Sequence, residues 1–419
     1  MNNRYTMQKK NIVILGAGIG GIITANNLRN KLPGDVSITI IEKNPVHTFP
    51  ASYLWLMVNK RRPKQIKSPL QNLLNSSINL KIASILHIDV KSKKITTDKE
   101  VIDYDFLVIS LGAELDFSSC DIKDDNICSF YNFDGAIKLR DSLLNFKGGK
   151  IVIAISSLPY KCPGAPYEGA MLIHEFLQKR NLAITSSVSL YSPEPHPLPI
   201  AGPILGNTVA EMLAKKQISY FPLHASTSID STQKIIKFSN DARAEYDLLV
   251  IIPQHKAPHA ILNSSLNDES GWIPVGRETL ETKNENVFAI GDVTSVTMPG
   301  RWSPDKPLKL PKAGVFAHSQ ALIVSEIIAS RILGYDTKAS FCGDGFCMLE
   351  AGEDLAGFAY GDFFASPQPD VKMKTIGKKW HIGKVLFERW WLSPYGFRKS
   401  FYKALIEYGA KRLKIPASL

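Results

Sequence analysis

The sequence predicts an α/β protein with two tandem domains built around buried strands, followed by a C-terminal segment of amphipathic helices. Apolar runs at residues 12–15 and 248–252 are typical of fully buried strands. The 419 residues are enough for two or three domains at roughly 100 to 200 residues each. A composition of 44% hydrophobic and 21% charged residues with five Cys is that of an ordinary globular protein, which excludes disorder and a disulfide-stapled miniprotein.

A glycine-rich turn follows the first buried strand. Gly16, Gly18 and Gly21 fit the pattern G-x-G-x-x-G at the start of an apolar helix, and the next strand ends in Glu42. Gly16 permits the tight turn, Gly18 lets the backbone approach a pyrophosphate, and Gly21 lets helix and strand pack closely. The helix N-terminus favours phosphate charge, and Glu42 is expected to accept a hydrogen bond from a ribose hydroxyl. The pattern predicts a Rossmann domain that binds a dinucleotide.

A second domain of the same type is predicted from an apolar strand at residues 150–155. The segment that follows, residues 156–168, contains three prolines and one glycine and carries Cys162. Proline lacks the amide donor and fixes φ, so this segment cannot form a pyrophosphate cradle. We therefore expect the electron donor not to be a nicotinamide nucleotide.

A motif far downstream favours FAD at the first domain. Residues 286–292 resemble the closing motif of flavoproteins with two dinucleotide-binding domains, in which a strand ends in Gly-Asp. The resemblance implies that Asp292 accepts a hydrogen bond from the ribityl chain of FAD. A helix is expected from about residue 311, with Lys312 and Gly314 at its start, and its N-terminal amides would stabilise negative charge on reduced flavin.

Four segments, 47–55, 161–168, 345–350 and 380–388, extend the resemblance over essentially the whole chain. In them the sequence resembles sulfide:quinone oxidoreductases and the related flavoprotein of flavocytochrome c sulfide dehydrogenase. This resemblance implies sulfide as the substrate, FAD as the cofactor and a membrane quinone as the electron acceptor. Flavocytochrome c relatives attach FAD through a cysteine, whereas residues 48–49 here offer no thiol, so noncovalent FAD is expected.

The resemblance also implies a redox pair, Cys162 and Cys347, beside the flavin. Hydrosulfide would open this pair by thiol-disulfide exchange, leaving a persulfide on Cys162 while Cys347 departs as a thiolate and passes two electrons to the flavin. Elemental sulfur or polysulfide would leave. Buried inert thiols are the alternative for both residues. Cys128 resembles an extra cysteine of part of the family and is interpreted either as an aid to sulfur release or as a structural thiol. Cys120 and Cys342 match no family position.

Three further residues are candidates for moving or pairing charge. Glu168 is interpreted either as a proton relay for sulfide or quinone or as a solvated glutamate at a helix start. His196 is a weaker candidate for a relay, and a surface loop is the favoured interpretation there. Lys312 would pair with reduced flavin or a quinone oxygen, unless it is a solvated lysine.

The net charge of +11 is concentrated at the C-terminus. Residues 372–419 contain twelve Lys or Arg and two Glu, so the first 371 residues carry only +1. In a helix, Phe397, Phe401, Leu405 and Tyr408 form one apolar stripe with cations beside it. Aromatic residues favour the headgroup layer and cations attract anionic lipid, so a helix on the bilayer surface is expected. The alternative is a helical pair packed on the protein itself.

Several other partners and features are not expected. No apolar run reaches about 18 residues, so we expect nothing that spans a bilayer. No recognised nucleic-acid motif accompanies the basic residues, and no cysteine spacing resembles a zinc site. The apolar N-terminal stretch is interrupted by glycines and lacks a plausible cleavage site, so no cleaved signal is expected.

The fold class is therefore α/β, with two tandem Rossmann-type dinucleotide-binding domains plus a C-terminal amphipathic-helix segment for membrane attachment. The FAD-binding domain is expected to be discontinuous, from residues 1–115 and 286–340. Residues 116–285 form the second Rossmann-like domain, and residues 341–419 the C-terminal domain.

The favoured function is a sulfide:quinone oxidoreductase attached peripherally (monotopically) to the cytoplasmic membrane. A type II NADH:quinone dehydrogenase is disfavoured by the proline-bearing loop. A flavoprotein subunit partnered by a cytochrome is disfavoured by the basic aromatic tail, and a scaffold with bound FAD would leave the two cysteine matches unexplained. The sequence leaves open the quinone type, the sulfur chain length, the membrane face and whether the chain forms a homo-oligomer.

Overall fold

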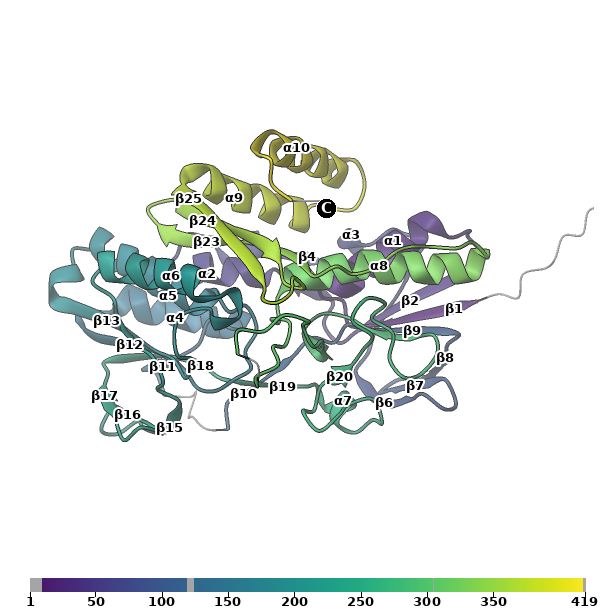
Figure 1. The fold of residues 1–419 in the computed structure, drawn as a ribbon. Coiled ribbons are helices and arrows are strands. Elements are labelled where there is room, and N and C mark those ends of the chain that lie inside the picture. The colour runs from purple at the N-terminus through teal and green to yellow at the C-terminus, as the bar shows by residue number, and fades with distance from the viewer. Residues whose placement is uncertain (1–9, 119–123, 304, 417–419) are drawn as a thin grey trace, which may run out of the picture.

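The computed structural model describes residues 10–118, 124–303 and 305–416 (Figure 1). A five-stranded parallel sheet forms the first unit, in the order β21-β9-β1-β2-β5. Its strands are β1 (Asn11–Leu15), β2 (Ser37–Glu42), β5 (Asn79–Ile82), β9 (Phe106–Ile109) and β21 (Val287–Ala289). The pairing of β21 with β9 brings a strand from far along the chain into this sheet.

Alternating side chains of the first sheet bury two different cores. Ile12, Ile14 and Ile40 pack against the helices α1 (Ile19–Lys31) and α8 (Gly314–Leu333). Val13 and Leu15 face the opposite way, toward the antiparallel sheet β6 (Ile85–Asp89), β7 (Lys94–Thr97) and β8 (Val101–Asp103). Strands covered on both faces explain why these runs are continuously apolar in the sequence.

The second unit repeats this plan. Its parallel sheet has the order β11-β18-β12-β13-β14, from β11 (Ile127–Cys128), β18 (Leu248–Ile252), β12 (Gly149–Ile155), β13 (Ser186–Tyr191) and β14 (Ser219–Phe221). One face carries the helices α4 (Phe133–Asn145), α5 (Ala165–Lys179) and α6 (Pro203–Lys215). The other face carries β15 (Ser226–Asp230), β16 (Ile235–Phe238) and β17 (Arg243–Glu245). The predicted α/β class is confirmed.

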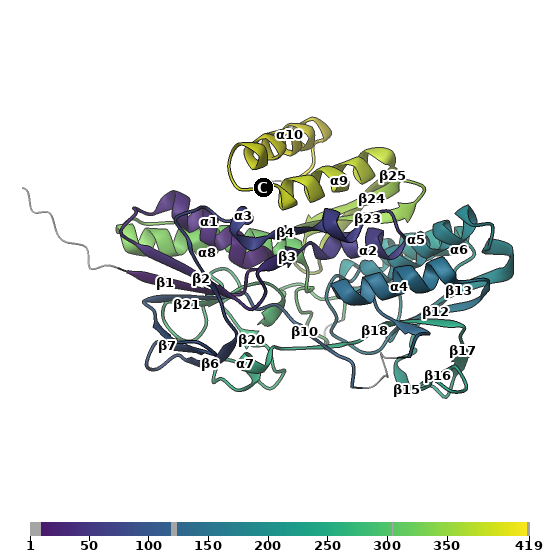
Figure 2. The same ribbon diagram turned by 180° about the vertical axis from the view of Figure 1, so that it is seen from behind.

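Short elements join the two units. The antiparallel pair β10 (Glu114–Asp116) and β19 (Gln254–Lys256) runs between them, as Figure 2 shows from behind. The remaining short strands and α-helices are β3 (Val46–Thr48), α2 (Tyr53–Met57), β4 (Lys67–Pro69), α3 (Leu70–Leu73), α7 (His259–Leu262), β20 (Ile273–Pro274) and β22 (Thr294–Ser295).

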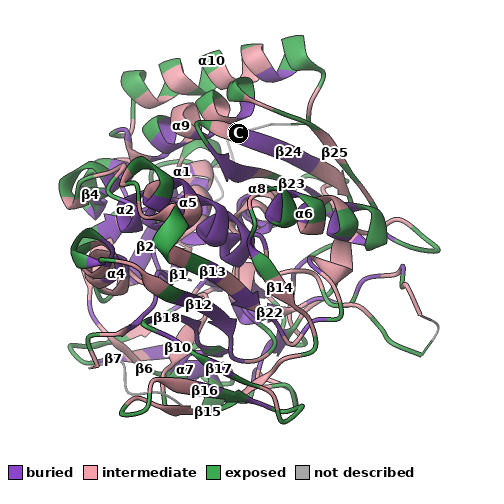
Figure 3. Cartoon of the chain, turned by 90° about the vertical axis from the view of Figure 1, so that its left-hand side faces the viewer, coloured by how far each residue is buried: buried purple, intermediate pink, exposed green. Residues whose placement is uncertain are grey.

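The C-terminal segment lies across both units. It consists of an antiparallel sheet, β23 (Asp344–Gly352), β24 (Leu355–Asp362) and β25 (Asp370–Gly377), then α9 (Lys378–Leu392) and α10 (Phe397–Leu413) (Figure 1). The outermost helix is α10, and most of its surface is exposed or intermediate in burial (Figure 3). No helix in the described part of the chain combines the length and apolar character needed to cross a membrane.

Candidate active site

A cavity of about 930 Å³ lies where the two units and the C-terminal segment meet. The glycine turn after β1, the loop before α5 and the N-terminus of α8 all contribute to its wall. β23 and α9 complete it from the C-terminal segment. Of the predicted site residues, the cavity brings together the following: Gly16, Gly18, Glu42, Cys162, Glu168, Asp292, Lys312, Gly314 and Cys347.

The glycine turn leaves open space for a ligand. Gly16 has a φ of +88°, and a Cβ on Gly21 would lie 1.9 Å from the Gly16 carbonyl oxygen, so both positions require glycine. A Cβ on Gly18 would meet nothing within 4 Å, because this residue faces the cavity. Glu42 accepts hydrogen bonds from the backbone N–H of Ala17 (3.0 Å) and Asn44 (3.1 Å). Its carboxylate therefore stabilises the turn itself, beside the place predicted for a ribose.

Asp292 follows β21 and lines the cavity, and one of its carboxylate oxygens has no hydrogen-bond partner in the described part of the chain. Among the described residues, no hydrogen-bond partner reaches its Oδ1, although the atom is buried. Burial raises the pKa of this carboxyl, and the nearby Lys161 and Lys312 oppose the shift. Buried acceptors are normally paired, so this atom marks the place of a missing donor. The open space at Gly18 and the unpartnered oxygen of Asp292 fit an FAD, which these residues would hold.

The start of α8 is built into the same wall. A Cβ on Gly314 would lie 2.5 Å from Ile19 Cδ1, so this glycine lets the first turn of α8 approach that of α1. Lys312 is buried, which rules out the alternative of a solvated lysine. Its Nζ donates to the carbonyl oxygens of Asp292 (2.6 Å) and Thr294 (3.2 Å), and burial lowers its pKa to about 8. Lys312 therefore fixes the Asp292 loop.

Cys162 and Cys347, 185 positions apart, line the same cavity. Cys162 has a φ of +52°, and its N–H donates to the carbonyl oxygen of Lys312 (2.6 Å). Cys347 lies on β23, with its Sγ 4.0 Å from where a Gly164 Cβ would stand. The surrounding protein atoms raise the pKa of Cys162 to about 12 and, together with Glu168, also raise that of Cys347, although the side chain of Cys347 is exposed where β23 lines the open cavity. Both thiols are thus neutral near pH 7, and an incoming anionic sulfur is the better nucleophile.

The other cysteines lie elsewhere. Cys128 is buried in β11 within the core of the second unit, its Sγ 3.4 Å from Ser142 Oγ, and is not among the residues that line the cavity. This position favours the structural interpretation of its thiol. Cys342 is exposed, with its Sγ 3.4 Å from the Ser340 carbonyl oxygen. Cys120 lies outside the described residues. His196 Nδ1 lies 3.1 Å from the carbonyl oxygen of Pro197, and His196 is not among the residues that line the cavity, although Glu194 and Leu198 are.

Glu168 is not the solvated glutamate that was one of the two expectations. It is buried in the first turn of α5, where it accepts hydrogen bonds from the backbone N–H of Glu350 (2.9 Å) and from Lys384 Nζ. Burial raises the pKa of Glu168, while the Lys384 charge opposes the shift. Burial lowers the pKa of Lys384, but Glu168, Glu350 and Cys347 outweigh it and raise the pKa overall. The charge of the buried Lys384 therefore acts on both Cys162 and Cys347 and lowers the pKa of each.

Sequence reasoning missed the second buried carboxylate of the wall, Glu194. Its Oε2 accepts hydrogen bonds from Tyr160 Oη (2.9 Å), Tyr167 Oη (3.2 Å) and Ser192 Oγ (3.4 Å). The tyrosines come from the loop after β12 and from α5, and both are buried in the core of the second unit. In the sequence only its place three residues after the end of β13 sets Glu194 apart, and this pattern is too weak to name it as a site residue.

Two other missed residues lie on helices. Lys384 is part of α9 and had been counted only among the basic residues of the tail. His318 on α8 lines the cavity, and in the described structure neither ring nitrogen has a hydrogen-bond partner. Burial lowers the pKa of His318 to about 4. No group of three or more His, Cys, Asp or Glu side chains within the described ranges is placed to share a metal ion.

Comparison with known proteins supports the resemblance noted in the sequence. Residues 10–314 match the family model of pyridine nucleotide-disulphide oxidoreductases. The sulfide-quinone reductase of Aquifex aeolicus is 27% identical over 397 residues, which cover 91% of this chain and 90% of that protein. The mitochondrial sulfide:quinone oxidoreductase of Mus musculus is 23% identical, covering 85% and 79% of the two chains.

Two solved structures are similar to this chain over nearly its whole length. The sulfide:quinone oxidoreductase from Aquifex aeolicus superposes with a TM-score of 0.80 at 25% identity, over 95% of both chains. NDH2 from Plasmodium falciparum, solved with NADH, has a TM-score of 0.70 at 14% identity, over 98% of this chain and 99% of that one. At that identity the second likeness concerns the fold alone.

Proposed function

The chain belongs to the pyridine nucleotide-disulphide oxidoreductase family, and we propose that within it the chain is a FAD enzyme that oxidises sulfide and passes two electrons to quinone. One observation carries this proposal. Two cysteines far apart in the sequence line the cavity that also holds the glycine turn and the unpartnered carboxylate of Asp292. A dithiol pair beside a flavin site is what two-electron sulfur chemistry requires.

The residues of the cavity divide the reaction between them. Hydrosulfide attacks the oxidised cysteine pair, so that an S–S bond forms at Cys162, which keeps a persulfide, and the bond to Cys347 breaks. The sulfur of Cys347 leaves with the electron pair, and the ammonium of Lys384 stabilises the resulting thiolate, since its charge opposes the rise in the pKa of Cys347. Bound FAD would supply the two-electron acceptor. Gly16, Gly18 and Asp292 would hold it, without a covalent bond.

NADH is a poor candidate for the electron donor. The loop after β12 carries Pro159, Pro163 and Pro166 where a pyrophosphate cradle would need free amides. Glu194 and its two tyrosines occupy space beside this loop. These two features support sulfide over NADH, although the overall fold resembles that of NDH2.

The surface of α10 supports peripheral membrane attachment. Phe397, Phe401, Leu405 and Tyr408 are 89%, 57%, 41% and 60% exposed, so the apolar stripe is not used in packing. An exposed apolar stripe flanked by cations suits the interface of an anionic bilayer. We place the protein on the cytoplasmic membrane, where α10 would bring the cavity close to dissolved quinone.

Steady-state turnover tests this function. Purified protein with FAD should reduce a short-chain, water-soluble quinone when sulfide is supplied under anaerobic conditions, and should show no comparable rate with NADH or NADPH. Quinone reduction that depends on NADH and not on sulfide would overturn the proposal.

A further inference from the structure

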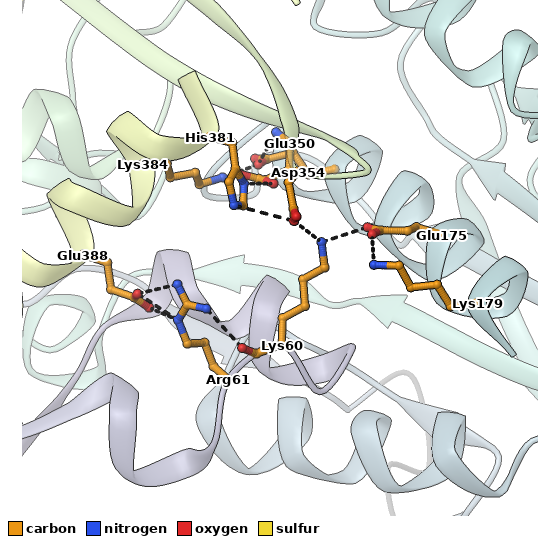
Figure 4. A network of polar contacts seen from close by, with 10 residues as sticks. Lys60, Arg61, Glu175, Lys179, Glu350, Asp354, His381, Lys384 and Glu388 are labelled. Atoms are coloured by element: carbon orange, nitrogen blue, oxygen red, sulfur yellow. Dashed lines mark hydrogen bonds and ion pairs between the residues drawn. The ribbon is translucent and has the colours of Figure 1, made fainter. Parts of the chain in front are cut away.

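A network of charged side chains joins α9, the turn after β23 and α5 (Figure 4). It begins at the cavity wall with Glu168 and Lys384, which are bonded to each other and buried. Glu350 on β23 comes next: its N–H donates to Glu168, and its charge raises the pKa of both Glu168 and Lys384. Three buried charges at the end of a redox cavity are costly to keep unless they serve a purpose beyond packing.

His381 continues the network outward. Its Nδ1 lies 3.1 and 3.0 Å from the two carboxylate oxygens of Glu350, which is completely buried. Its Nε2 lies 3.7 Å from Asp354 Oδ1 in the turn between β23 and β24. The Asp354 side chain is 61% exposed, so the series ends in solvent. His381 therefore presents one ring nitrogen to Glu350 and the other to Asp354, and an imidazole can accept a proton at one nitrogen and release one from the other.

We propose that Glu168, Lys384, Glu350, His381 and Asp354 form a proton relay between solvent and the cavity, with His381 as its outer gate. The inference rests on the proposed function and extends it to the route of the protons. Lys384 passes a proton from one carboxylate to the other by turning between Glu350 and Glu168, and His381 exchanges it with solvent at Asp354. In this relay the residues transfer protons along the series and do not themselves contact sulfide or quinone.

The overall reaction needs such a route. Oxidation of HS⁻ to zero-valent sulfur releases two electrons and one proton, whereas quinone takes up two electrons and two protons to become the hydroquinone. Each turnover on HS⁻ therefore draws one proton from solvent into a buried cavity. The observed series connects the cavity to solvent through groups that can each hold or donate that proton.

Two further cations, Lys60 and Arg61, form ion pairs in the same region. Lys60 lies 3.0 Å from both Glu175 and Asp354, and Arg61 forms a bidentate pair with Glu388. The charged or aromatic groups around His381 are Glu350, Asp354, Lys384, Lys60 and the ring of Trp55. Lys60 also pairs with Glu175, which in turn pairs with Lys179. If the network had only a structural role, its ion pairs would serve to hold α9 against α5 and the segment after α2. The experiment must therefore separate proton transfer from folding.

Two half-reactions followed by stopped flow make this separation. The variant His381→Asn keeps a polar side chain that can face Glu350 but cannot titrate. Sulfide should reduce its flavin within about twofold of the normal rate. Reoxidation by a soluble quinone should slow by at least about tenfold, since a positioned proton carrier typically contributes 10²–10⁴-fold. The solvent deuterium isotope effect on that step should rise, and added imidazole should restore much of the rate.

Two further variants test the outer end of the relay. In Asp354→Asn the reoxidation of the flavin by quinone should slow by a smaller factor. In the control Glu353→Gln this rate should not change, since Glu353 is an exposed neighbour that pairs with Lys216.

The outcomes distinguish this relay from the function on which it rests. If wild-type protein is not reduced by sulfide, the proposed function fails. If wild-type protein turns over but quinone reoxidises His381→Asn at the normal rate, or imidazole gives no rescue of a slowed variant, the relay is overturned and the function stands. Should His381→Asn lose its flavin or its fold, Asp354→Asn decides: a normal rate and isotope effect there also overturn the relay.

Discussion

Cys162 is held in an uncommon backbone conformation by bonds that belong to the cavity wall. A non-glycine residue with positive φ costs of order 1–3 kcal/mol and persists where its surroundings impose it. Here the Lys312 carbonyl oxygen accepts from Cys162 N–H, and the Cys162 carbonyl oxygen accepts from Ala165 N–H (2.9 Å). The loop thereby places Cys162 in the cavity wall, where it also packs against the core of the second unit.

Replacing either cysteine should separate flavin binding from turnover. Cys162→Ser and Cys347→Ser should each retain FAD but lose sulfide-dependent quinone reduction, because each removes one sulfur from the exchange and leaves the glycine turn intact. Flavin absorbance and steady-state rates measure the two effects. Cys342→Ser is the matched control and should be nearly silent, since that thiol is exposed and lines no part of the cavity. Either site variant reducing quinone at the normal rate would contradict the assignment.

Asp292 should contribute to flavin affinity. Asp292→Ala removes the acceptor for a ribityl hydroxyl, and a hydrogen bond to a charged group is worth about 1.5–3 kcal/mol, or roughly a 10- to 150-fold loss of affinity. The FAD content after extensive dialysis, followed by titration with FAD, measures the loss. A variant that keeps full flavin occupancy would speak against this role.

The sequence indicated some site residues and could not indicate others. Gly16 and Gly18 occur in a local pattern whose spacing follows from backbone geometry, and Asp292 is implied by the resemblance of residues 286–292 to a flavoprotein motif, so these three could be named in advance. Glu194 and Lys384 could not, because each is defined by partners that tertiary packing brings to it: the hydroxyls of Tyr160 and Tyr167 for one, Glu168 for the other.

At the scale of single elements, the two C-terminal helices have different roles that the sequence did not separate. Trp380, Trp390 and Trp391 of α9 are buried, so this helix follows the packed alternative. The apolar stripe of α10 is exposed. Cations and aromatic residues are frequent in both helices, so the composition alone does not distinguish the packed helix from the exposed one. A deletion that starts at Lys378 would therefore open the core and would not isolate membrane binding.

The helix α9 is tied to the first unit by a hydrogen bond that acid should break. Trp391 Nε1 donates to His47 Nε2 (2.8 Å), so Nδ1 of His47 carries the ring proton, toward the Ala17 carbonyl oxygen (3.2 Å). Burial lowers the pKa of His47 from 6.5 to about 4. Protonation requires Nε2 to give up its role as acceptor.

Stability should therefore depend on pH through His47. Because its pKa is lower in the folded state, the unfolded chain binds the proton first, and the contribution of His47 to folding is lost as pH falls from about 6.5 to about 4. The free energy of unfolding, from urea titrations at several pH values, should fall less steeply in His47→Gln than in wild type within this window. His87→Gln, at an exposed position on β6, should match wild type. Parallel curves for His47→Gln and wild type would contradict the expectation.

The exposed face of α10 should bind anionic bilayers. Phe397→Ser with Phe401→Ser removes two apolar side chains, each worth about 1.5–3 kcal/mol when fully buried, so vesicle binding should weaken at least about tenfold. Salt should weaken the binding of both proteins, because the nearby cations contribute through screened attraction. Cosedimentation with vesicles measures this. Ile184→Ser with Ile204→Ser, which changes two exposed apolar residues elsewhere, should bind normally. If the α10 variant also binds normally, α10 is not the anchor.

At the scale of the whole molecule, two α/β units of similar architecture differ in the loop that follows a central strand. The first leaves an open turn at Gly18 and an unpartnered acceptor at Asp292. The second carries a cysteine loop in the equivalent place, with Glu194 and two tyrosines packed behind it. The repeated strand patterns let the sequence predict both units. The C-terminal sheet, which brings Cys347 to the loop of Cys162, depends on contacts across the whole chain and was not foreseen as a sheet.

Anaerobic bleaching of the flavin is the most direct test of this division of roles. In the purified protein with FAD bound, addition of sulfide should reduce the flavin and bleach its visible absorbance, whereas NADH at the same concentration should leave the spectrum unchanged. Bleaching by NADH, or a flavin that sulfide does not reduce, would contradict the assignment of the second unit to sulfur chemistry.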